Sequence, residues 1–171
     1  CWQVRLWDEN GAPGPWSEKA WFEMGLLEPA DWCAKWITGA YIPEKKHRYP
    51  ADEFLKSFKV ARSIQKARLY ITACGIYDAC INGRPAVNFL LAPGFTDYRR
   101  RLHYQTYDVT ALLHTGINSL TVTLGDGWYR GSIGAMGVRN FYGSQTRFMA
   151  QLEITFEDKT RQVIISDEHF L

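Results

Sequence analysis

The sequence has no long hydrophobic run and no strong excess of charge of either sign. Among its 171 residues, no stretch reaches the roughly 18 apolar residues that a membrane-spanning helix needs. The formal net charge is +2, and Lys and Arg are scattered among Asp and Glu. A surface for nucleic acid or for an anionic membrane needs concentrated positive charge. We therefore expect no nucleic-acid partner and no membrane partner.

Cysteine is scarce as well. The cysteines Cys1, Cys33, Cys74 and Cys80 form no CxxC pair, and no histidine stands at zinc-binding spacing from them. Cys74 and Cys80 lie in apolar runs, which is typical of buried free thiols. Unpaired cysteines favour a reducing compartment, so the sequence predicts a cytoplasmic location. From its own residues it predicts no metal site and no cofactor.

The motifs of complete active sites are also missing. The sequence contains neither HExxH nor GxSxG, and its 4 histidines are dispersed along the chain. A glycosidase needs two carboxylates that flank the scissile bond. The aspartates here stand in ordinary turns and at strand ends. We therefore expect no catalytic residue in this chain.

What the sequence does contain is a succession of short strands and turns. The pair Asn82-Gly83 predicts a hairpin because both residues tolerate positive φ, and residues 108–116 predict about one helical turn. No βαβ alternation occurs. The sequence therefore predicts an all-β fold, an antiparallel β-sandwich of the jelly-roll-like, carbohydrate-binding-module type with a short helical turn. The expected strands lie within 1–8, 19–27, 35–42, 54–60, 66–81, 101–110, 118–129, 147–156 and 161–167.

A linker near residue 30 divides the chain. Residues 1–30 hold two expected strands around a turn at 9–17, and two strands cannot bury a core of their own. We interpret residues 1–30 as the C-terminal hairpin of a truncated domain plus a linker, and residues 31–171 as a β-sandwich domain truncated at its C-terminal end. The chain starts without Met inside an expected strand and stops without a cap or polar tail. We expect a fragment of a longer protein.

Two strings contain residue types that bind ligands. In "LGDGWYRG" (124–131), a carboxylate, two aromatics and a guanidinium stand between glycines, and "LAPGFTDYRRR" (91–101) is the second string. The first is no nucleotide motif, because GxGxxG needs a helix after it. On extended backbone Trp128 and Tyr129 point to opposite faces, so one can anchor in the core while the other meets a ligand. A purely structural loop fits the same pattern. The candidate substrate-binding residues are Asp97, Tyr98, Asp126, Trp128, Tyr129 and Arg130.

The run from Phe54 to about Phe156 resembles the N-terminal β-sandwich domain of bacterial α-L-rhamnosidases, which belong to glycoside hydrolase family 78. The preceding residues resemble the end of the fibronectin-III-like domain that leads into it in this family. The resemblance rests on five strings, namely GIY at 75–77, ING at 81–83, APGFTDY at 92–98, YQTYDVT at 104–110 and GDGWYRG at 125–131.

The resemblance implies a modular enzyme that removes terminal L-rhamnose from glycosides. Its catalytic (α/α)6 barrel, with a glutamic general acid and a second Glu that activates water in an inverting mechanism, is not in this chain. The implied partners are L-rhamnose-containing glycosides and that barrel of the same parent chain. In some members a related sandwich binds rhamnose with calcium, but no calcium ligand matches a residue here. Two functions stay open for the fragment: an accessory carbohydrate-binding domain, or a structural sandwich that packs against the barrel.

Overall fold

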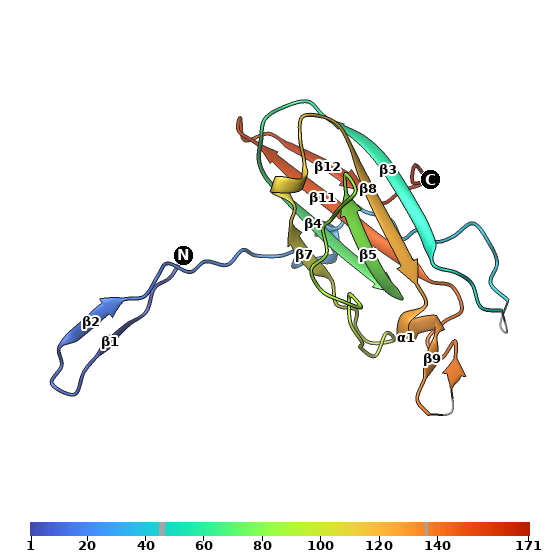
Figure 1. The fold of residues 1–171 in the computed structure, drawn as a ribbon, viewed down its shortest axis with the longest axis horizontal. Helices are drawn as coiled ribbons and strands as arrows, with labels where there is room; N and C mark the ends of the chain where they lie inside the picture. The colour runs from blue at the N-terminus through green and yellow to red at the C-terminus, as the bar shows by residue number, and fades with distance from the viewer. Residues whose placement is uncertain (45–46, 136) are drawn as a thin grey trace. The chain divides into compact units, whose positions relative to one another are not determined.

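The computed structural model describes residues 1–44, 47–135 and 137–171. The chain forms two compact units, Cys1–Trp32 and Cys33–Leu171, which are described separately below. Figure 1 draws both units in one picture. None of the helices among the described residues is long and apolar enough to cross a membrane.

The first unit is a small hairpin without a core. Strand β1 (Arg5–Trp7) pairs antiparallel with β2 (Pro13–Trp16), and none of residues 1–32 is buried. The strand expected at 19–27 is wrong, since only Ala20 there forms a bridge, to Trp2. The second strand instead lies in the segment expected to be a turn. Proline has no backbone N–H to donate to a neighbouring strand. The prolines of β2 are tolerated because each strand of a two-stranded ribbon has one edge that needs no such donor.

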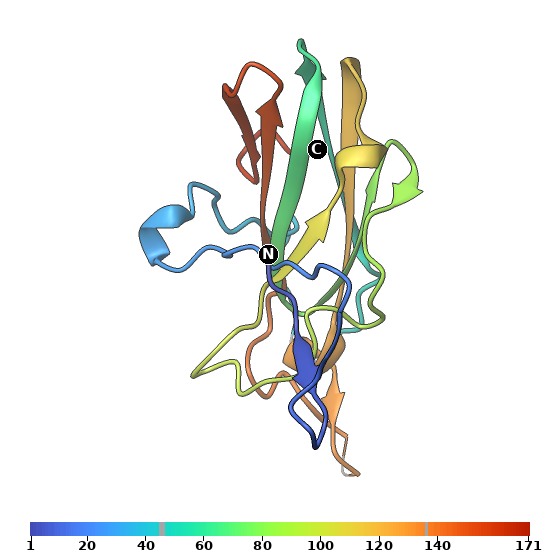
Figure 2. The same ribbon diagram turned by 90° about the vertical axis from the view of Figure 1, so that its left-hand side faces the viewer.

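The second unit is a sandwich of two antiparallel four-stranded sheets, which confirms the predicted all-β sandwich (Figures 1 and 2). The strand orders are β12-β11-β4-β7 and β3-β8-β5-β6. The strands are β3 (Asp52–Val60), β4 (Ile64–Cys74), β5 (Ile76–Ile81), β6 (Arg84–Pro85), β7 (Gln105–Asp108), β8 (Gly116–Gly125), β11 (Arg147–Phe156) and β12 (Arg161–Ile165). A separate short ribbon pairs β9 (Ser132–Ile133) with β10 (Val138–Arg139).

The core lies between the two sheets because their strands alternate with a period of two residues. In β8 the side chains of Leu120, Val122 and Leu124 are buried, and the residues between them are only partly covered. In β11 Phe148 is fully buried and packs edge-on against Phe54 of β3, with ring centroids 5.0 Å apart. One continuous apolar layer thus holds the two sheets together.

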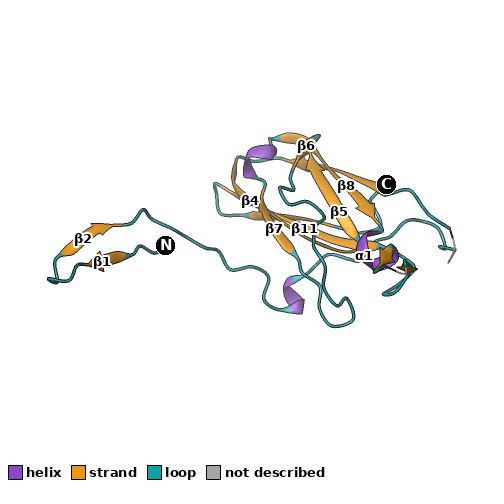
Figure 3. Cartoon of the chain, turned by 60° about the horizontal axis from the view of Figure 1, so that its bottom comes forward, coloured by secondary structure: helices purple, strands orange, loops and turns teal. Residues whose placement is uncertain are grey.

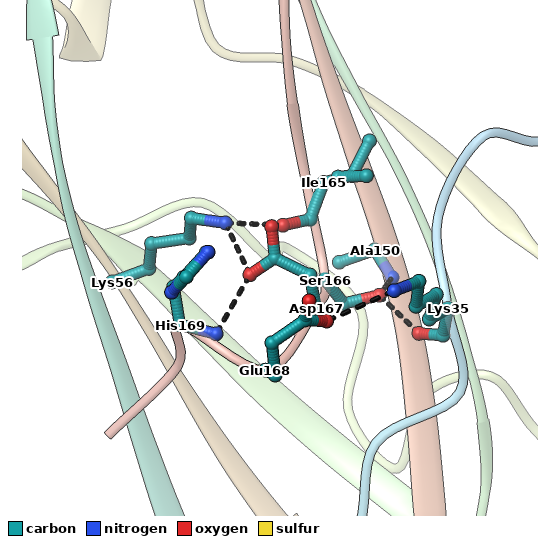
Figure 4. A network of polar contacts seen from close by, with 8 residues as sticks. All are labelled: Lys35, Lys56, Ala150, Ile165, Ser166, Asp167, Glu168 and His169. Carbon is teal, nitrogen blue, oxygen red and sulfur yellow. Dashed lines mark hydrogen bonds and ion pairs between the residues drawn. The ribbon is translucent and has the colours of Figure 1, made fainter.

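Strand β3 carries a lysine at a core-side position. Phe54, Phe58 and Val60 are buried on the same parity. Lys56 stands between them, and its Nζ donates to the carbonyl of Ile165 at 2.8 Å and pairs with Asp167 at 2.6 Å (Figure 4). The apolar stem of the lysine covers the core while its charge is satisfied at the rim.

Several local predictions are confirmed. The hairpin that joins β5 to β6 turns at Asn82 and Gly83, whose φ angles are 53° and 73°. Residues Thr110–Leu112 form the expected helical turn, as a 3-10 helix. All cysteines are free, with Cys74 buried and Cys80 partly covered.

Other strands are shorter than expected. Within 35–42 only Ile37 pairs, as an isolated bridge to Phe148. The strand expected at 101–110 is reduced to β7. Before it the chain turns, because the carbonyl of Asp97 accepts the N–H groups of Arg100 and Arg101 at 2.9 and 3.0 Å. The backbone hydrogen bonds of this turn take the place of the hydrogen bonds to a neighbouring strand that were expected at the start of 101–110.

Candidate functional site

The string at 124–131 spans the end of β8 and the single turn of helix α1 (Gly127–Arg130), as Figure 3 shows. Trp128 and Tyr129 therefore do not stand on extended backbone, and the expectation that they point to opposite faces of a strand is wrong. Gly127 has a φ of +50°, and a Cβ at this position would lie 2.6 Å from Cγ2 of Ile76. The helix begins here because only glycine fits so close to β5.

Asp126 and Arg130 are paired with each other inside the fold. Nε of Arg130 donates to Oδ1 of Asp126 at 2.6 Å, and Nη2 of Arg139 donates to Oδ2 of the same carboxylate at 2.9 Å. Arg130 is only 2% exposed. Its Nη1 donates to the hydroxyl of Tyr41 at 2.9 Å, and that hydroxyl donates to Asp52 at 2.9 Å. The network ties helix α1 to the start of β3.

The electrostatics of this network keep Arg130 charged. Burial alone lowers the pKa of Arg130, but hydrogen bonds to Tyr41 and Asp126 outweigh that effect and raise the pKa above its ordinary value. Burial also raises the pKa of the Tyr41 phenol. Among the described residues, Nη2 of Arg130 and Nε of Arg139 have no hydrogen-bond partner. The network is thus an ion-paired support in which two guanidiniums share one carboxylate.

Six aromatic side chains gather beside α1, and we call them the aromatic cluster. The ring of Tyr98 lies 5.4 Å from that of Tyr129 and 5.0 Å from that of Tyr142. Phe95 lies 5.9 Å from Trp128. The fold therefore brings together the two strings singled out in the sequence, and adds residues from 141–142. The members are Phe95, Tyr98, Trp128, Tyr129, Phe141 and Tyr142.

The cluster has a covered interior and an exposed rim. Tyr98 and Tyr129 are half-buried, and a Cβ at Gly143 would collide with the phenol of Tyr129. Burial raises the pKa of Tyr98 to about 12, and it also raises the pKa of Tyr129. Both phenols are therefore neutral near pH 7. Phe95 and Phe141 are 53% and 48% exposed, so part of each ring is accessible to a ligand.

Polar groups flank this rim. The guanidinium of Arg99 lies 4.6 Å from the ring centroid of Phe141, and its Nη2 donates to the carbonyl of Phe141 at 3.1 Å. Asp97 is exposed, and its Oδ1 accepts the N–H of Arg99 at 3.2 Å. Its other carboxylate oxygen lies 3.7 Å from Nε of Arg100. A carboxylate and a guanidinium thus stand beside exposed aromatic faces.

Sequence reasoning missed part of this arrangement. Phe95 and Arg99 were inside the second string but carried no signal of their own, while Phe141 and Tyr142 belonged to neither string. The sequence shows an adjacent aromatic pair at 141–142 before Gly143, but nothing in it indicates that this pair packs on Tyr98.

The residues present do not fit the calcium that the resemblance implied in some members. Among the residues that the structure describes, no group of three or more His, Cys, Asp or Glu side chains is placed to hold a metal ion. Binding of a hard cation such as calcium needs six to eight oxygen ligands.

Comparison with known families gives two matches. The model described as "Alpha-L-rhamnosidase N-terminal domain" matches residues 62–171. The model described as "Rha78A-like, N-terminal immunoglobulin domain" matches residues 1–28. The second is an immunoglobulin description, whereas the sequence had suggested a fibronectin-III-like domain.

Individual relatives agree with the first match. An α-L-rhamnosidase of Alteromonas sp. (strain LOR) is 37% identical over 98% of this chain and 19% of its own length. The crystal structure of an α-L-rhamnosidase from Aspergillus terreus is 40% identical with a TM-score of 0.93, covering 98% of this chain and 20% of that one. The Streptomyces avermitilis α-L-rhamnosidase complexed with L-rhamnose is 40% identical with a TM-score of 0.68, covering 70% of this chain and 12% of that one. The chain spans about a fifth of the length of the first two relatives.

Proposed function

The chain belongs to the α-L-rhamnosidase N-terminal domain family, and we propose that it is a non-catalytic part of such an enzyme that assists carbohydrate recognition. The parent enzyme would hydrolyse terminal L-rhamnose from glycosides. The names of the relatives support this activity, as does a relative whose structure was solved in complex with L-rhamnose.

The aromatic cluster is the observation that carries this proposal. A sugar ring offers C–H groups on one face and hydroxyls around its edge, so a protein binds it with aromatic faces and nearby polar groups. Phe95 and Phe141 supply exposed faces. Asp97 and Arg99 supply an acceptor and a donor at the same rim. We assign Trp128, Tyr98 and Tyr129 the task of holding these rings in place.

Asp126 and Arg130 fit a supporting role better than direct contact with sugar. A side chain that is 2% exposed, as Arg130 is, reaches no ligand in solution without rearrangement. Both oxygens of Asp126 already accept hydrogen bonds from arginines. In this proposal the pair fixes α1, and through α1 the positions of Trp128 and Tyr129.

The structural alternative rests on the same exposed aromatics. A catalytic domain of the parent protein that packed on Phe95 and Phe141 would cover them, and the cluster would then be a packing surface. In that case the isolated chain has exposed rings but no affinity for sugar. The two functions therefore differ in one measurable property, the response of the cluster to L-rhamnose.

The test is a titration of the 171-residue chain with L-rhamnose to tens of millimolar, followed by NMR. We expect saturable shifts of the Trp128 indole N–H and of the amides at 95–99, with a millimolar dissociation constant typical of a small polar ligand. Phe95→Ala and Phe141→Ala should each weaken binding severalfold. Phe22→Ala is the matched control, because Phe22 is also exposed, at 73%, but lies in the first unit.

No shift in the wild type at tens of millimolar sugar would favour the packing function over recognition. A second assay addresses catalysis. We expect no hydrolysis of an aryl α-L-rhamnoside by the purified chain, because both oxygens of Asp126, the carboxylate of the first string, are already bound by Arg130 and Arg139. Measurable turnover by a preparation free of other rhamnosidases would contradict the non-catalytic assignment.

A further inference from the structure

A pocket lies on the sheet β3-β8-β5-β6, and none of its lining residues belongs to the aromatic cluster. Its volume is about 460 Å3, and residues of the segment 87–91 form much of its wall. Strand β5 holds both ends of this segment. The N–H of Ala86 donates to the carbonyl of Ala79 at 2.9 Å, and the N–H of Tyr77 donates to the carbonyl of Ala92 at 2.8 Å. We call the segment 87–91 the arch, because hydrogen bonds to β5 fix both of its ends while its residues line the pocket.

The pocket lies on the side of the sheet that faces away from the core. Thr123 of β8 lines it and alternates with the buried Val122 and Leu124. Thr123 pairs directly with Asp78 on β5, which lines the pocket too. The pocket is therefore not a packing defect between the sheets, but a feature built onto the outer surface.

The arch exposes unusually large apolar side chains. Phe89, Leu90 and Leu91 are 53%, 90% and 53% exposed. Leu91 also has a φ of +59°, a region that bulky residues rarely adopt. Strain of this kind is concentrated at ligand-binding segments. Exposed leucines and a strained backbone are both explained if the arch closes on a ligand that covers them.

The lining also selects the chemistry of that ligand. Most of the wall is apolar, and the polar side chains among its lining residues are those of Tyr77, Asp78, Asn88 and Thr123. The hydroxyl of Tyr77 lies in the core, 3.3 Å from that of Tyr107. The Oδ1 of Asp78 accepts the N–H of Ala79 at 2.8 Å, so the acceptor proposed for a ligand is the other carboxylate oxygen. Among the described residues that line the pocket, none is Lys, Arg or His. An anionic ligand would meet the Asp78 carboxylate without a compensating cation, whereas a hydroxyl can donate to it.

We propose that this pocket binds a neutral ring compound, one ring or two fused rings, that carries a hydroxyl group. The size is sufficient, since a cavity of about 150 Å3 already accommodates benzene and ligand pockets begin near about 300 Å3. The ring lies against Ile76, Val87 and Leu91, and its hydroxyl donates to Asp78. None of the lining residues belongs to the aromatic cluster, so the proposal is independent of the sugar recognition proposed above.

The probe pair that tests the proposal is 2-naphthol and naphthalene-2-carboxylate, which share a ring system and differ in charge. Titration of the full chain with 2-naphthol should shift the NMR amide signals of 88–91 and Thr123 in a saturable way. Naphthalene-2-carboxylate should bind several-fold more weakly because of repulsion by Asp78. Asp78→Asn removes the negative charge, so it should reduce the difference in affinity between 2-naphthol and naphthalene-2-carboxylate.

The matched variants are Thr123→Phe and Thr121→Phe, which add the same bulk to the same face of β8. Thr121 does not line the pocket, so Thr121→Phe should bind 2-naphthol as the wild type does. Thr123→Phe fills the pocket and should weaken binding about tenfold or more. If Thr123→Phe does not fold, Ala51→Trp serves the same purpose, because Ala51 also lines the pocket.

Three results would overturn the proposal: no saturable shift in the wild type, equal affinity of the two probes, or unchanged 2-naphthol binding when the pocket is filled. If the wild-type chain binds 2-naphthol but does not respond to L-rhamnose, that result counts against the proposed sugar recognition and leaves the proposed pocket ligand standing. The opposite pattern would count against the pocket alone.

Discussion

Arg130 and Lys56 both lie in covered positions of the sandwich, and their charges are satisfied in different ways. Arg130 on α1 pairs with Asp126, four residues earlier, and with Tyr41. Lys56 on β3 pairs with Asp167, which is 111 residues away, and with the backbone carbonyl of Ile165. The first partner is local and can be seen in the sequence string. The second exists only because the fold brings the chain after β12 back to β3.

The contrast shows that a charged residue in a conspicuous motif is not thereby a ligand-binding group. The sequence makes Arg130 a candidate for substrate contact because Arg130 stands in a glycine-rich string, while Lys56 stands between the buried Phe54 and Phe58 of β3. In the structure the charge of Arg130 links α1 to Tyr41, and the charge of Lys56 links β3 to the residues after β12. The variants below separate the two networks, from the largest expected effect to the smallest.

Replacing Arg130 by Met should have the largest effect. It removes a guanidinium that is 2% exposed and leaves Asp126 and the Tyr41 hydroxyl short of a partner. Breaking a buried ion pair from one side typically costs about 3–5 kcal/mol of unfolding free energy. Urea unfolding followed by circular dichroism measures the loss.

The control for that variant is Arg101→Met, since Arg101 is exposed and surface substitutions usually change stability by less than about 0.5 kcal/mol. If the two arginine variants unfolded at the same urea concentration, Arg130 would not be a structural support, and direct contact with a ligand would become the better assignment.

Lys56→Met should cost less, about 1–3 kcal/mol. Methionine retains most of the apolar stem, but Asp167, whose side chain is 15% exposed, loses its cation. Lys35→Met is the matched control within the same network (Figure 4), because the Lys35–Glu168 pair is 63% and 66% exposed. We expect no measurable change from it, as solvent screens such pairs. Equal losses from the two lysine variants would contradict this ranking.

The smallest effect is a pH dependence at Asp167. Burial raises the pKa of this carboxyl, but hydrogen bonds from Lys56 and from the N–H of His169, with the charge of Lys56, hold it below its usual value. A lowered folded-state pKa adds stability above the unfolded value, about 3.9. That stability is lost as the pH falls through the folded pKa.

The stability difference between wild type and Asp167→Asn should therefore be full at neutral pH and shrink as the pH falls below about 4. Urea midpoints of both proteins across this range provide the measurement. A difference that stayed constant down to pH 3 would mean that the Asp167 carboxylate is not stabilised in the folded state.

Much of the fold was readable from local patterns. The strand β8 and the Asn82-Gly83 hairpin depend on residues close in sequence. The hairpin was predicted correctly, and the strand expected at 118–129 exists but ends at Gly125. The strand expected at 35–42 failed for a different reason. It has strand-like composition, yet it forms only an isolated bridge at Ile37 and one backbone hydrogen bond from Lys35 to Ser166, because pairing is decided by which edges the tertiary fold leaves open.

The candidate site shows the same limit. The sequence predicted three of the six cluster residues, Tyr98, Trp128 and Tyr129. Tyr142 packs on Tyr98, and Phe141 packs on Tyr142, through a loop closure that no local pattern encodes. The helical turn at 127–130 was missed as well. Its cause is the close approach of Gly127 to Ile76 of β5, a contact between residues about 50 positions apart.

The tail after β12 also bears on how the chain behaves in concentrated solution. Strand β3 is an outer strand of its sheet, and an open outer strand can recruit another molecule through its free backbone groups. Leu171 exchanges both backbone hydrogen bonds with Leu55, at 2.9 and 3.0 Å, and Gln162 donates to the carbonyl of Lys59 at 2.9 Å. The Lys56–Asp167 pair holds this cover in place. A chain that ends before Asp167 lacks this cover. We expect it to self-associate, which light scattering detects, while the sandwich itself stays folded.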